Sequence, residues 1–161
     1  MISAPVAATP RQSTTAAPGA RQPRDLSGVQ VRMERTSCYG ICPSYSVDIG
    51  GDGQVSYVGV EFVAKRGRMK GSADPAQINR LMDEAERIRL ATLVTAPECA
   101  KMETDQATVI LTVRDNGQTI KLTHYLGNGC YPKDLEDFEA FVDEVAGTRA
   151  WVRCETGFCV N

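Results

Sequence analysis

The residues with the most evident chemistry in this sequence are its six cysteines, because a thiol can form a disulfide, bind a metal ion or act as a redox nucleophile. Cys38 and Cys42 frame a glycine in the segment CYGICPSY, and the other cysteines are Cys99, Cys130, Cys154 and Cys159. An even number of cysteines in a chain with one histidine favours disulfides over free thiols, and disulfides persist in oxidising compartments.

The sequence favours one pairing in particular. Cys99 precedes and Cys130 follows a segment with the pattern of a β-hairpin, so closing the hairpin brings both to the same end of a sheet. We expect a disulfide there, and the chain-entropy argument credits a loop of that length with about 3.5 kcal/mol. The remaining cysteines could close two smaller rings, worth roughly 2 kcal/mol each, Cys38 with Cys42 and Cys154 with Cys159.

A redox or metal-binding role for Cys38 and Cys42 is the second hypothesis. Thiol oxidoreductases use C-x-x-C at a helix N-terminus, whereas this motif is C-x-x-x-C followed by Pro43 and a strand pattern. Cys38, Cys42, His124 and a third cysteine could in principle bind zinc, but the ligand spacings typical of structural zinc sites are absent. We therefore expect no metal and no cofactor.

Asp105 and His124 are the other candidates for chemistry. The expected hairpin register places both near its open end, and a carboxylate that orients an imidazole is half of a hydrolase triad. However, the chain contains no G-x-S-x-G elbow to supply a nucleophile. We favour a structural interpretation, in which His124 is a hydrogen-bonded, partly buried side chain and Asp105 caps a turn. A hydrolase is the third hypothesis, and an enzyme is not the expected outcome.

Alternating apolar residues indicate the strands that would position these groups. The alternation predicts strands at three places in the first part of the chain, residues 29–34, 45–49 and 55–57. Residues 60–70 can continue this meander, and Arg66, Arg68 and Lys70 share one face there. We interpret that face as the solvated side of an edge strand rather than a site for an anionic partner.

The second part of the chain predicts two helices and a second hairpin. Asp74-Pro75 and the apolar periodicity after it predict a helix over about 75–90, followed by a loop. Asn116-Gly117 is typical of a type I′ turn between strands 108–114 and 118–125. A second helix is predicted from Pro132 to about Gly147. The order β-β-β-(β)-α-β-β-α predicts an α+β fold, an antiparallel sheet built from hairpins with two helices packed on one face.

The length and charge of the chain narrow its class. The 161 residues suffice for one domain with its own core, and a well-mixed net charge of -2 gives no indication of nucleic-acid binding. No apolar run approaches the roughly 20 residues of a membrane span. We expect a disordered leader at 1–27, from which a signal peptide has been removed, then the domain at 28–152 and a cysteine-containing tail at 153–161.

Three stretches resemble a bacterial family catalogued as domain of unknown function 6438. They are CYGICPSYSV with GDGQVSYVG, then Cys99 with TDQATVILTV, and THYLGNGC leading into a helix and a Trp. The motif residues include Tyr39, Gly40, Pro43, Tyr45, Tyr125 and Gly127. The resemblance brings no activity and implies an exported or lipid-anchored envelope protein.

Together, the cysteines and the absence of a coherent catalytic set favour an extracytoplasmic, non-catalytic domain. We expect it in the periplasm or cell envelope, with a structural or binding role and an envelope protein as the class of partner.

Overall fold

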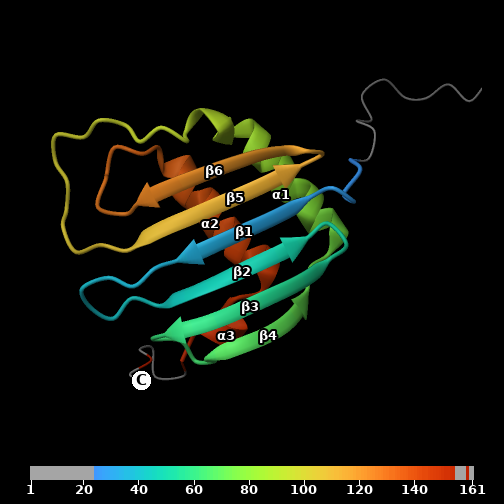
Figure 1. Cartoon of the computed structure of the whole chain (residues 1–161), viewed down its shortest axis with the longest axis horizontal. Coiled ribbons are helices and arrows are strands. Elements are labelled where there is room, and N and C mark those ends of the chain that lie inside the picture. Colours follow the sequence, from blue (N-terminus) through green and yellow to red (C-terminus); the bar gives the residue numbers. More distant parts are fainter. Residues whose placement is uncertain (1–23, 155–158, 160–161) are drawn as a thin grey trace, which may run out of the picture.

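The computed structural model of the protein describes residues 24–154 and Cys159. Residues 1–23 of the expected leader, and most of the expected tail, lie outside the described residues. Within the described part, six strands form one antiparallel sheet in the order β4-β3-β2-β1-β5-β6 (Figure 1). The strands are β1 (Gln30–Arg35), β2 (Ser44–Gly50), β3 (Gln54–Glu61), β4 (Gly67–Ser72), β5 (Thr108–Asp115) and β6 (Gln118–Tyr125).

The two main helices, α1 (Pro75–Arg87) and α2 (Lys133–Ala146), cover the same face of this sheet (Figure 1). The Asp74 side chain accepts a hydrogen bond from the Ala76 N–H (2.8 Å), which caps α1. Gly147 ends α2 with φ = 69°, as expected for a C-cap glycine. The short helices are η1 (Leu90–Thr92) and α3 (Arg149–Val152). The predicted α+β fold, with two helices on one face, is confirmed.

The registers of the hairpins follow from their turns. Asn116 (φ = 45°) and Gly117 (φ = 87°) form the two-residue loop of the second hairpin. Val109 therefore lies opposite His124, as predicted. On β4, Arg68 and Lys70 lie opposite Val58 and Ser56, on the face that the helices leave uncovered.

The central position of β1 is the feature of the sheet that the sequence pattern did not predict. Met33 lies opposite Val47 on one side and Leu111 on the other, so β1 joins the first meander to the second hairpin. In the sequence, β5 comes after α1 and a long loop. The length of that loop does not indicate which strand β5 pairs with. Met33 itself is completely buried beneath the helices.

The core lies between the sheet and the two helices. The helical stripe that the sequence predicted is buried, with Leu135, Phe138 and Val142 of α2 at zero exposure. Trp151 in α3 extends this core along β3, because its ring stacks at 4.9 Å from the ring of Tyr57. Burial of these apolar side chains is the main favourable term for the fold.

Replacing Phe138 with Ala tests the position of this core. We expect the free energy of unfolding to fall by about 3 to 5 kcal/mol, because the change opens a cavity in a fully buried site. Urea denaturation followed by circular dichroism measures this loss. Lys121→Ala, at an exposed position on β6, is the control and should change the same free energy by less than about 0.5 kcal/mol. Similar losses for both variants would contradict this placement of the core.

Candidate functional site

The three disulfides of the protein lie at one end of the sheet. Cys38–Cys42 closes the loop between β1 and β2, and Cys99–Cys130 joins the loop before β5 to the loop after β6. Cys154–Cys159 follows α3, where the Trp151 carbonyl accepts a hydrogen bond from Lys65 in the β3–β4 loop (2.8 Å). We call this end of the sheet, with loops 36–43, 62–66, 93–107 and 126–132, the loop end.

Backbone hydrogen bonds join these loops to one another. The Thr36 N–H donates to the Thr108 carbonyl (2.9 Å), and the Tyr39 N–H donates to the Asp105 carbonyl (3.1 Å). The Cys38–Cys42 loop therefore runs beside the segment that enters β5. Segments 38–45, 99–108 and 124–130, which are far apart in the sequence, meet at this end of the sheet.

Tyr125 and Gly127 fix the loop that contains Cys99. The Tyr125 hydroxyl donates to the Glu103 carbonyl (2.8 Å), and the Glu103 N–H donates to the Gly127 carbonyl (2.8 Å). A Cβ atom on Gly127 would lie 2.0 Å from the Glu103 carbonyl oxygen and 2.4 Å from the Tyr125 ring. Only glycine fits at this position, which gives the motif glycine a steric reason.

The surface of the loop end carries apolar side chains. Tyr39 is 91% exposed and Ile41 is 52% exposed, both within the Cys38–Cys42 loop, beside the exposed Gly40 and Pro43. Met102 and Leu126 are further exposed apolar residues at this end. A disulfide-closed loop that presents a tyrosine to solvent is a surface suited to contact another molecule.

A polar cluster lies beneath this surface, between the sheet and α2. The Arg35 guanidinium donates two hydrogen bonds to the Asp143 carboxylate (2.9 and 3.1 Å), and the Tyr45 hydroxyl donates a third (2.7 Å). Burial opposes the charge of Arg35, but the Asp143 carboxylate outweighs it and raises the Arg35 pKa. Burial and the Asp143 charge raise the pKa of Tyr45 as well.

His124 belongs to the same buried layer. Its Nδ1 lies 2.8 Å from a carboxylate oxygen of Glu139 on α2, and the two side chains are 1% and 2% exposed. Its ring also lies 4.6 Å from the ring of Tyr131. The imidazole is therefore enclosed and already paired.

Asp105 does not supply the carboxylate that His124 contacts. It lies exposed in the loop before β5 with φ = 64°, and its carboxylate accepts a hydrogen bond from the Thr104 hydroxyl (3.2 Å). The dyad of the hydrolase hypothesis is thus replaced by His124 and Glu139, which the sequence analysis missed. The available signal was a glutamate on the apolar stripe of a predicted helix, between Phe138 and Val142.

The chain matches the profile of one known protein family. The profile of a family described as "Domain of unknown function (DUF6438)" matches residues 29–146, which is most of the chain. The chain belongs to this family. No curated protein matches it. The matched region contains the disulfides Cys38–Cys42 and Cys99–Cys130, but not Cys154–Cys159. It also contains both residues of each polar contact that Asp143 and Glu139 make with the sheet.

The cysteines of this DUF6438 domain are arranged as disulfides rather than as a thiolate site. The Cys38–Cys42 loop leads into β2, so neither cysteine stands at a helix N-terminus, the position typical of redox-active thiols. Zinc would need these sulfurs as thiolates, whereas the structure joins Cys38 and Cys42 in a disulfide. Among the described residues, no group of three or more His, Cys, Asp or Glu is placed to hold a metal ion.

Two tyrosines in neighbouring strands allow a matched test of the buried cluster. The Tyr45 hydroxyl bonds Asp143, whereas the Tyr57 hydroxyl is buried with no hydrogen-bond partner among the described residues. Tyr45→Phe should lower the free energy of unfolding by about 2 kcal/mol, because a hydrogen bond to a charged group is lost. Tyr57→Phe should raise it by about 1 kcal/mol, because an unpaired buried hydroxyl is removed. Urea denaturation measures both changes.

Alkaline pH provides an independent readout for Tyr57. Burial raises its pKa to about 12, above the ordinary value of about 10. Between these values the folded state keeps a proton that the unfolded state releases, so stability falls as pH rises from 10 to 12. Tyr57→Phe should reduce this slope. An unchanged slope, or a loss of stability in Tyr57→Phe at neutral pH, would contradict the unpaired hydroxyl.

Proposed function

We propose that this DUF6438 domain works outside the cytoplasm as a non-catalytic, disulfide-stabilised module that binds an envelope protein through the loop end. The observation that carries the proposal is the arrangement of the cysteines. All six are paired, and the loop that Cys38–Cys42 closes presents Tyr39 at 91% exposure.

The disulfides support an oxidising compartment. Cys99 and Cys130 are 31 positions apart, and a bridge over that separation stabilises the fold by about 3.5 kcal/mol. A small domain has only about 5 to 15 kcal/mol in total, so this stabilisation is a large share. Glutathione and thioredoxin would keep such thiols reduced in the cytosol, which makes an extracytoplasmic site the better fit.

The shape of the loop end supports a protein partner. Tyrosine side chains are frequent hot spots at protein interfaces, because they bury a large rigid surface and carry a polar group at the tip. The backbone of Tyr39 is tied to Asp105 and flanked by the Cys38–Cys42 bridge, so its loop loses little conformational freedom on binding. Ile41 adds apolar surface in the same loop.

The position of His124 supports binding rather than catalysis. A general base must reach its substrate within about 3 Å, whereas this imidazole lies beneath α2 with 1% of its side chain exposed. Its role in the proposal is to pair with Glu139 and hold α2 against the sheet.

The compartment can be tested by counting thiols. Protein isolated from its native cells without reductant is unfolded in denaturant and treated with an alkylating reagent, with and without prior reduction. We expect no alkylation without reductant and six alkyl groups after it, because all six cysteines are paired. Intact mass spectrometry measures the difference. Alkylated cysteines in the unreduced sample would refute the disulfide framework and, with it, the assignment of the compartment.

The partner can be tested by photo-crosslinking in intact cells. A photoreactive phenylalanine analogue at position 39 should give adducts of defined mass, because the Tyr39 ring stands at the proposed contact. The matched control places the analogue at Val58, an exposed position on the uncovered face of β3. The adducts should disappear in the Cys38→Ser, Cys42→Ser double variant. Equal adducts at positions 39 and 58, or adducts unchanged in the double variant, would count against the loop end as the interface.

A further inference from the structure

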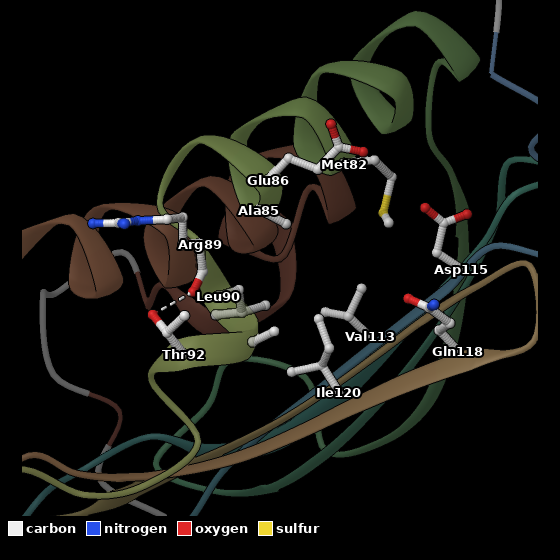
Figure 2. Close-up of a pocket in the computed structure, with 11 residues that line it drawn as sticks. Met82, Ala85, Glu86, Arg89, Leu90, Thr92, Val113, Asp115, Gln118 and Ile120 are labelled. Carbon is white, nitrogen blue, oxygen red and sulfur yellow. Dashed lines mark hydrogen bonds between the residues drawn. The ribbon is translucent and has the colours of Figure 1, made fainter.

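A groove of about 370 Å³ lies between the C-terminal end of α1 and the tip of the β5–β6 hairpin (Figure 2). It is near the opposite end of β5 and β6 from the disulfides and shares no lining residue with the loop end. Apolar side chains from α1, η1 and the hairpin line it, namely Met82, Ala85, Leu90, Val113 and Ile120. Its volume lies within the range of small-ligand sites, about 300 to 1,000 Å³.

The polar rim of the groove is acidic on one side. Figure 2 shows the carboxylates of Glu86, from α1, and Asp115, from the hairpin, on the same side of the groove as the Met82 side chain. The side chain of Arg89 points away from the groove in the same view. An apolar floor with carboxylates at one side complements a molecule with an apolar body and a positive head.

The chain itself places a cation against these carboxylates. The Arg24 guanidinium, from the segment before β1, donates hydrogen bonds to Asp115 of the hairpin and to Glu86 of α1. It also lies 3.4 Å from Asp83. Arg24 thus shows that the carboxylates of Asp115 and Glu86 can bind a guanidinium group.

We propose that the groove binds small cationic amphiphiles, in which an apolar chain ends in a guanidinium or ammonium group, and that Arg24 competes for the cation position. The chain of the ligand lies on Leu90 and Ile120, and its head contacts Asp115. A carboxylate or phosphate head that displaced Arg24 would instead meet two like charges, so an anionic amphiphile cannot take the same position.

The competition sets the expected effects of two substitutions. Asp115→Asn removes a charged acceptor from the head position, so the affinity for a cationic ligand should fall roughly tenfold. Arg24→Gln removes the internal competitor and should raise the same affinity several-fold. A groove that served only as an apolar crevice would respond to neither change.

The probes are octylguanidinium and octanoate, which share an apolar chain and differ in the sign of the head. Each is titrated into the full chain while the methyl resonances of Met82 and Ile120 are followed by NMR. Octylguanidinium should shift both methyls saturably, and octanoate should not. Asp48→Asn, which alters a half-buried carboxylate on the uncovered sheet face, is the control and should leave the affinity unchanged.

Gln118→Lys is a second variant for the case in which Asp115→Asn disturbs the hairpin turn. It adds a positive charge at the exposed rim and should weaken octylguanidinium binding. The proposal is overturned by equal binding of octanoate, by saturable binding that leaves the Met82 and Ile120 methyls unmoved, by the absence of binding, or by an affinity that none of the charge variants changes. The outcome is independent of whether the loop end binds a protein.

Discussion

The pairing of two carboxylates between α2 and the sheet, one buried and one partly buried, is the constraint on which the rest of the structure depends. Glu139 and Asp143 lie one turn apart on the face of α2 that covers the sheet, so both must find partners there. His124 on β6 meets the first, and Arg35 on β1 meets the second. Because these partners stand in one row across the sheet, α2 can dock in only one position along it without leaving a charge unpaired.

The two ends of the sheet are built differently. At one end, short turns such as Asn116-Gly117 join the strands with little chain to spare. At the other, long loops are held by covalent bridges and by backbone bonds such as that between Tyr39 and Asp105. Exposed apolar residues outside the core, including Tyr39 and Ile41, lie in these longer loops.

Local patterns predicted the elements of this fold because the physics that forms them is local. The Asn116-Gly117 turn fixed its register by geometry, and Gly147 ended α2 as its position indicated. Contacts between distant segments were less predictable, since nothing near β1 or β5 in the sequence encodes their pairing. The contact of His124 was equally hard to predict. Its partner Glu139 lies on α2, and the alternating pattern of β6 carries no information about that helix. The Figure 2 groove also arises only when α1 and the hairpin tip are brought together.

The central position of β1 has a consequence for how the protein matures. The sheet consists of two halves, β4 to β1 and β5 to β6, which meet only along the β1–β5 seam, where Gln30 lies opposite Arg114. Cys38–Cys42 lies wholly in the first half, and Cys99–Cys130 closes around the second. No disulfide crosses the seam. The cysteines of each half can therefore be oxidised before β1 and β5, which are far apart in the sequence, pair with each other. Noncovalent packing alone then decides when the two halves become one domain.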